Sequence, residues 1–181
     1  MGNQLLSQAP CHSEDLLVCF RQVKTTMPDI QKTLVLLKPD ALQRDLLGEI
    51  ITRFERKGLK IVGMKFIRLN DSMLDEHYAH LADKPFFAGL KKFMMQTPVV
   101  GMVFEGFSAI EEVRKIVGST NPLSADAGTI RADFSMAVPS NLIHASDSVE
   151  NAEAEVKRFF APEEIFQYEK ITDKFVFGEG I

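Results

Sequence analysis

The chain has 181 residues, of which 45% are hydrophobic and 25% are charged, a composition that predicts one globular domain with a buried core. Its formal net charge of −4 argues against bulk electrostatic binding to nucleic acid or to an anionic membrane surface. It shows neither a bilayer-spanning apolar run nor a secretory signal, and Cys11 and Cys19 suggest no disulfide framework, so a cytoplasmic protein is expected.

Residues 1–31 differ in pattern from the rest and are expected to form an appendage of unknown role. Ser13 is placed to cap a short helix over residues 14–23, which would end before Pro28. A regular alternation of strand and helix patterns begins at Lys32. We therefore expect the principal domain to span residues 32–181.

The first part of this domain has a strand–helix–strand pattern. A buried strand is predicted over residues 33–37, ending at Pro39. Apolar spacing predicts a helix over residues 48–57, with Gly58 as its C-cap. A second strand is predicted over residues 59–69.

Two short helices and a third strand come next. Ser72 with Asp75 resembles a capping box before a helix that runs through Leu81. Pro85 suits the first turn of another helix, because proline is tolerated where the backbone N–H has no helical partner. The third strand is predicted over residues 99–104.

The last part of the domain adds a helix, a strand and a second helix. Ser108 with Glu111 resembles another capping box, and the helix that it opens should end at Gly118. The remaining predicted elements are a long ordered loop over residues 119–129, a fourth strand over 132–138 and a helix over 149–160. The major elements then follow the order β-α-β-β-α-β, which is typical of a ferredoxin-like α+β fold: a four-stranded antiparallel sheet with helices packed on it, on one face.

A single histidine, His144, lies just before the last predicted helix. Ser146, Asp147 and Ser148 are favoured helix N-cap residues, so the imidazole would lie near the positive end of a helix, where an anion is stabilised. Imidazole is a competent nucleophile near neutral pH when one nitrogen is held and the other is free. Taken alone, however, a histidine at such a boundary is more often a capping or surface residue.

Several familiar catalytic motifs are absent from the sequence. It has no Walker A loop, no G-x-G-x-x-G turn, no protein-kinase signature, no G-x-S-x-G elbow and no Cys/His set with zinc spacing. His77 and His80 lie three residues apart on a predicted helix without an accompanying carboxylate, which favours a solvated helix face over a metal site.

Six short motifs, in order along the chain, give a stronger indication. They are Lys38-Pro39-Asp40; Gly48-Glu49-Ile50-Ile51 with Arg53-Phe54-Glu55; Lys84-Pro85-Phe86-Phe87; Thr120-Asn121-Pro122; Gly128-Thr129-Ile130-Arg131; and Asn141-Leu142-Ile143-His144-Ala145-Ser146-Asp147-Ser148. Together they resemble the nucleoside diphosphate kinase family, from about Lys32 to about Gln167. A single tetrapeptide would be weak support, but six in register are highly specific.

This resemblance implies a role for His144 and the residues around it. His144 matches the nucleophile that carries the γ-phosphoryl group of a nucleoside triphosphate, usually ATP, to a nucleoside diphosphate in a ping-pong reaction. Glu155 matches the glutamate that holds the imidazole, and Ser146 the serine that supports this glutamate. The other matches are Tyr78 beside the histidine and γ-phosphate, Lys38, Arg114, Thr120 and Arg131 at the phosphates, and Asn141 with Lys38 at the ribose hydroxyls.

The resemblance also implies the base site, the cofactor and the assembly. Phe86 and Val138 match the pair that clamps the base, an arrangement tolerant of different bases and sugars. Mg²⁺ would be carried by the nucleotide phosphates rather than by a protein cage. Members of the family are usually hexamers, so a homo-oligomer is expected. Ala145, Ala41 and Asp45 stand where glycine is frequent, which puts the local loop geometry in question.

Two other classes of function remain open at this stage. One is a non-catalytic scaffold or binding module, which would have no need for the whole set of matched residues. The other is an RNA-binding domain, since ferredoxin-like sheets also serve that role. The acidic net charge and the lack of an RNP1-like aromatic strand argue against RNA binding.

Overall fold

The computed structural model describes residues 29–178, so the helix predicted over residues 14–23 lies outside the described part of the chain. The strands are β1 (Ile30–Leu37), β2 (Lys60–Ile67), β3 (Val99–Phe107) and β4 (Ile143–Ala145). The longer helices are α3 (Leu47–Lys57), α4 (Asp71–His77), α5 (Phe87–Met94), α6 (Ala109–Val117) and α8 (Val149–Phe159). Shorter ones are α2 (Pro39–Gln43), α7 (Ile130–Phe134), α9 (Asp173–Val176) and the 3-10 turns η1 (Ala79–Leu81), η2 (Pro122–Ser124) and η3 (Pro162–Glu164).

The four strands form one antiparallel sheet in the order β2-β3-β1-β4. β1 and β2 therefore run in the same direction with β3 inserted between them, which is the split β-α-β arrangement of the ferredoxin-like fold. The predicted fold class is confirmed. Among the described residues, no helix is both long and apolar enough to cross a bilayer.

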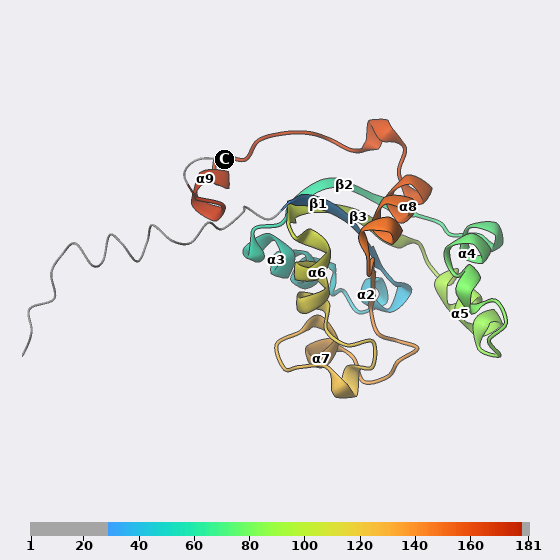
Figure 1. Cartoon of the computed structure of the whole chain (residues 1–181). Helices are drawn as coiled ribbons and strands as arrows, with labels where there is room; N and C mark the ends of the chain where they lie inside the picture. Colours follow the sequence, from blue (N-terminus) through green and yellow to red (C-terminus); the bar gives the residue numbers. More distant parts are fainter. Residues whose placement is uncertain (1–28, 179–181) are drawn as a thin grey trace, which may run out of the picture.

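The expectation that helices pack on one face is wrong, since helices cover both faces of the sheet and β1 is buried on both sides (Figure 1). Val35 and Leu37 pack with α3 and α6 on one face, while Leu34 and Leu36 pack with α4, α5 and the end of α8 on the other. Successive side chains of a strand point to opposite faces, so this division follows the two-residue period of β1. A run of consecutive apolar residues is what a strand buried on both faces requires.

The prediction of a fourth strand over residues 132–138 is wrong. Helix α7 occupies the start of this segment, because the Thr129 side chain accepts a hydrogen bond from the backbone N–H of Ala132 and so caps a helix. The fourth strand instead comes later and is only three residues long. It pairs with β1 so that His144 lies opposite Leu36.

Two predicted capping boxes are also wrong in detail, although both helices exist. Asn70, rather than Ser72, is the N-cap of α4, and its side chain accepts from Met73 N at 2.9 Å. Ser108 does precede α6, but it is in the left-handed region (φ 46°) and its side chain makes no capping bond. Pro85 lies two residues before α5 rather than in its first turn. The Gly58 and Ser148 caps are confirmed.

Candidate active site

The orientation of His144 follows from the alternation of side chains along β4. Its neighbours Ile143 and Ala145 pack with α3 and α6, so the imidazole between them points to the opposite face, where α8 lies. Ala145 is absent from the residues with positive φ. Position 145 therefore does not need the left-handed backbone that favours glycine, and alanine fits the strand there. Asp45, in contrast, does have a left-handed backbone (φ 56°).

A strained turn precedes β4 and is held by the Lys38-Pro39-Asp40 segment. Leu142 has a φ of 67°, and Ile143 N donates to Asn141 O at 2.8 Å across it, which makes a tight three-residue turn. Asp40 Oδ2 accepts from Leu142 N at 2.9 Å, and Lys38 N donates to Leu142 O at 2.8 Å. These bonds from the end of β1 hold the backbone that carries His144.

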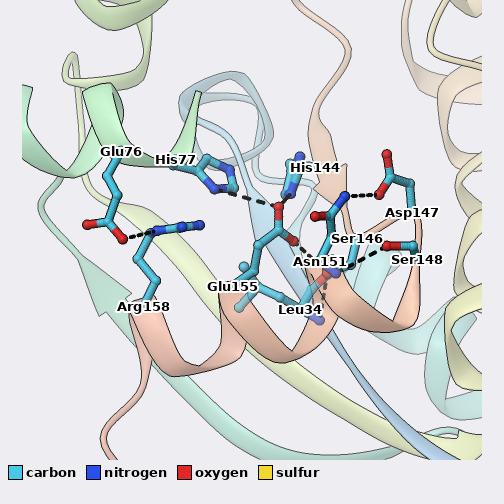
Figure 2. A network of polar contacts seen from close by, with 10 residues as sticks. All are labelled: Leu34, Glu76, His77, His144, Ser146, Asp147, Ser148, Asn151, Glu155 and Arg158. Carbon is cyan, nitrogen blue, oxygen red and sulfur yellow. Dashed lines mark hydrogen bonds and ion pairs between the residues drawn. The ribbon is translucent and has the colours of Figure 1, made fainter. Parts of the chain in front are cut away.

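The Glu155 carboxylate, on α8, forms a hydrogen bond with one nitrogen of the His144 imidazole (Figure 2). Glu155 Oε1 lies 2.9 Å from His144 Nε2, and Ser146 Oγ donates to Glu155 Oε2 at 2.5 Å. Because an ionised carboxylate only accepts hydrogen bonds, Nε2 carries the proton and Nδ1 keeps its lone pair. Burial acts to raise the pKa of Glu155, but the hydrogen bonds that it accepts from His144 and Ser146 outweigh this effect and hold that pKa below its usual range.

His144 opens onto a cavity of about 1180 Å³ that is lined by residues from α4, η1, α5, α6, α7, β4, α8 and the loops between them. All but one of the site residues predicted from the sequence lie in its wall: Lys38, Tyr78, Phe86, Arg114, Thr120, Arg131, Val138, Asn141, His144 and Glu155. The exception is Ser146, which donates a hydrogen bond to Glu155. Phe86 is 56% exposed and Val138 is 48% exposed, so neither is a core side chain. The fold thus brings together residues from distant parts of the sequence.

Two of the cations in this wall are buried and tied into the surrounding loops. Lys38 Nζ donates to Asn141 Oδ1 at 2.6 Å, and Asn141 Nδ2 donates to Thr120 O at 2.9 Å. The Arg131 guanidinium donates to Gly118 O at 2.9 Å and to Ile143 O at 2.7 Å. Burial lowers the pKa of Arg131 to about 10, which leaves it charged at neutral pH. Arg131 therefore fixes the loops while adding positive charge to the cavity.

His77 is a residue that the sequence did not assign to the site. It was expected on a solvated helix face, but its side chain is only 1% exposed, and its ring centroid lies 4.5 Å from that of His144. The missing carboxylate partner is Glu155, which is far away in sequence and close in space, with His77 Nδ1 3.6 Å from Glu155 Oε1. The only sequence signal was its position next to Tyr78.

An oriented imidazole that faces a cavity lined by four Lys and Arg side chains is typical of a phosphotransferase, because phosphoryl transfer needs a nucleophile and electrostatic stabilisation of phosphate oxygens. The family model described as nucleoside diphosphate kinase matches residues 31–165. The chain belongs to this family.

Individual relatives and solved structures agree with this assignment. The chain is 55% identical to a nucleoside diphosphate kinase of Parabacteroides distasonis over 140 residues, covering 77% of this chain and 92% of the relative. It is 46% identical to human nucleoside diphosphate kinase A over 151 residues, covering 83% of this chain and 99% of that one. A halophilic nucleoside diphosphate kinase from Halobacterium salinarum, solved in complex with CDP, superposes with a TM-score of 0.79 at 42% identity, covering 82% of this chain and 99% of that structure.

Proposed function

We propose that this chain is a nucleoside diphosphate kinase that transfers the γ-phosphoryl group of a nucleoside triphosphate through a phosphohistidine at His144. The observation that carries this proposal is the 2.9 Å contact between His144 Nε2 and Glu155 Oε1, which leaves Nδ1 unprotonated beside a cation-lined cavity. Nδ1 attacks the γ-phosphorus, a P–N bond forms, and the bond to the β-phosphate oxygen breaks to release the diphosphate. A second nucleoside diphosphate then takes the phosphoryl group by the reverse step.

The charge changes in this step fit the surrounding side chains. Phosphorylation of Nδ1 makes the imidazole ring cationic, and the Glu155 carboxylate compensates that charge through Nε2–H. Arg114, Arg131 and Lys38 stabilise the phosphate oxygens, and Thr120 adds a hydroxyl donor. Burial, with a further contribution from Glu155, raises the pKa of Tyr78, so this phenol stays neutral and can donate a hydrogen bond near the reacting group.

The remaining cavity residues fit the nucleoside. Lys38 and Asn141 would bind the ribose hydroxyls, and Phe86 and Val138 would hold the base between an aromatic and an aliphatic face. Such a clamp makes no base-specific hydrogen bond, so we propose broad tolerance of base and sugar, with ATP as the usual donor.

Mg²⁺ is proposed as the cofactor, bound to the nucleotide phosphates. Among residues 29–178 the one group of three metal-ligand side chains includes two histidines, whereas Mg²⁺ prefers oxygen ligands in octahedral geometry. The cations of the cavity wall suit phosphate oxygens and leave the metal to the nucleotide. When bound, Mg²⁺ neutralises part of the phosphate charge.

The proposals on organisation rest on family membership. We propose that residues 32–181 form the kinase domain, that residues 1–31 are an appendage, and that the protein is a cytoplasmic homo-oligomer, a hexamer. Light scattering at micromolar concentration tests the assembly, and a monomer would contradict it.

A direct labelling experiment tests the phosphohistidine. Brief incubation with γ-labelled ATP and Mg²⁺ should label the protein, and the label should be labile in acid and stable in base. Addition of an unlabelled nucleoside diphosphate should remove it within one turnover, as a ping-pong route requires. Absence of an acid-labile label would refute the mechanism.

The pH dependence of the reaction should reflect Lys38. Its burial, together with the positive charge of Arg131, lowers the pKa of Lys38 to about 8. The side chain is therefore charged below this pH and neutral above it, so kcat/KM for the nucleotide should be about tenfold lower at about pH 9 than on the plateau below pH 7. Initial rates across this range measure the effect. Lys38→Arg, which keeps its charge throughout, should flatten the profile, and a flat wild-type profile would contradict the assignment.

A further inference from the structure

The mechanism proposed above leaves one buried titratable side chain at the site without a task. His77 is the last residue of α4, and the rings of Tyr78, His144 and Phe159 pack around it with centroid distances of 4.4, 4.5 and 5.0 Å. Neither of its ring nitrogens has a hydrogen-bond partner among the described residues. Buried polar groups nearly always have a partner, so a fully unpartnered imidazole indicates a ligand that the protein itself does not supply.

His77, His144 and Glu155 each direct one ligand atom to the same small volume. These three atoms all lie within 4.8 Å of one another. Figure 2 shows the Glu155 oxygen between the two imidazoles. Two imidazole nitrogens and one carboxylate oxygen are a common donor set for Zn²⁺ with a fourth, open position, whereas Mg²⁺ disfavours imidazole.

Two of the three distances between the ligand atoms are close to those that Zn²⁺ needs, whereas the two imidazole nitrogens, which lie within 4.8 Å of each other, must approach by up to about 1.5 Å when the ion binds. Bonds of about 2.0 Å in tetrahedral geometry place ligand atoms about 3.3 Å apart. His77 Nδ1 and Glu155 Oε1 are 3.6 Å apart and need little adjustment. His144 Nε2 and Glu155 Oε1 are 2.9 Å apart, so this pair must open by about 0.4 Å to admit the ion.

The protonation states of the three residues also favour a cation. Neither His77 nitrogen is engaged by a protein group among the described residues, so its lone pair can be offered to a metal ion. Glu155 is ionised. His144 Nε2 would lose its proton to solvent as the metal takes its place. The positive charge of Arg158, which acts on His77, is partly compensated by its 2.7 Å ion pair with Glu76.

We propose that His77, His144 and Glu155 form a zinc site through which Zn²⁺ reversibly inhibits the enzyme. The ion replaces the His144–Glu155 hydrogen bond that orients the nucleophile, so an imidazole bound to zinc is no longer available for phosphoryl transfer. The binding half of this proposal depends only on the geometry, and the inhibition half rests on the function proposed above.

Zinc binding is measured on the full-length protein by calorimetric titration with Zn²⁺ alone. Cys11, His12 and Cys19 lie outside the described residues and are zinc ligands by residue type, so the titration uses a background in which they are replaced by Ser, Ala and Ser. One site is expected, and His77→Phe, which keeps an aromatic ring in the pocket, should weaken it at least about 100-fold. His80→Phe changes a neighbouring exposed histidine and should leave it unchanged.

Inhibition is measured as loss of histidine labelling when Zn²⁺ is added to excess Mg²⁺ and γ-labelled ATP. Each variant is compared with its own zinc-free rate, and the half-inhibiting zinc concentration should rise at least about tenfold in His77→Phe. A chelator selective for zinc over magnesium should restore labelling. If labelling proceeds but zinc binds His77→Phe as tightly as wild type, the zinc site is refuted. If zinc binds in a His77-dependent manner but His144 is never labelled, the proposed function fails instead.

A second measurement needs no variant and so does not depend on the folding of His77→Phe. X-ray absorption at the zinc edge of the loaded protein, in the same background, should show two imidazole ligands and at least one oxygen ligand. A spectrum with one imidazole or none would overturn the proposal.

Discussion

Replacing His144 with alanine is expected to lower kcat by on the order of 10⁵-fold or more, because in the proposed mechanism this side chain forms the bond to phosphorus. Both half-reactions pass through the same nitrogen, so the loss should be equal with every nucleotide pair. The phosphohistidine label should disappear as well. Coupled assays of diphosphate formation and gel autoradiography measure the two effects.

The matched control is His80→Ala, which removes an exposed histidine that also lines the cavity but has no part in the proposed mechanism, and it should leave the rate unchanged. The variant His144→Ala should also fold normally, since the imidazole is part of the wall and is 22% exposed rather than a core side chain. A variant that still transfers phosphate at near wild-type rates would exclude His144 as the nucleophile. It would favour the scaffold or binding-module alternative only if labelling were also absent from the wild type.

The sequence was sufficient to predict the fold where local signals and packing agree. The buried strand before Pro39, the helix closed by Gly58 and the helix capped by Ser148 all lie where the pattern places them. Residues 132–138 were misassigned because their strand-like composition says nothing of the Thr129 cap that starts a helix there. The true fourth strand has only three residues, too few for a two-residue period to be recognised.

Motif order named the residues that share the cavity wall, but physical reasoning on the sequence could not show that they come together. Lys38 and Asn141 are 103 residues apart in sequence, and their 2.6 Å contact depends on the pairing of β1 with β4. His77 shows the limit most clearly. Its sequence neighbours gave no reason to expect burial, because Glu155 and Phe159, which surround it, come from α8 at the far end of the chain.

Replacing Glu155 with glutamine is expected to lower kcat by about 100- to 1,000-fold with little change in KM. The amide is nearly isosteric, but it carries no negative charge to compensate the imidazole ring when Nδ1 is phosphorylated. Glutamine can also turn its NH₂ group toward Nε2, which would move the ring proton to Nδ1 and block attack. Glu155 contacts Nε2 of the imidazole and, in the proposed mechanism, not the nucleotide, so nucleotide affinity should be preserved. Steady-state kinetics and the pre-steady-state rate of labelling measure these effects.

Ser146→Ala separates the charge of Glu155 from its orientation. The serine hydroxyl donates to Glu155 Oε2 at 2.5 Å and accepts from Leu34 N at 3.3 Å, so its loss leaves the carboxylate charged but less firmly held. We expect a reduction of about tenfold in kcat, intermediate between wild type and Glu155→Gln. If Glu155→Gln were no slower than Ser146→Ala, the carboxylate charge would have no role in the transition state. Orientation of the imidazole alone would then account for the contribution of Glu155.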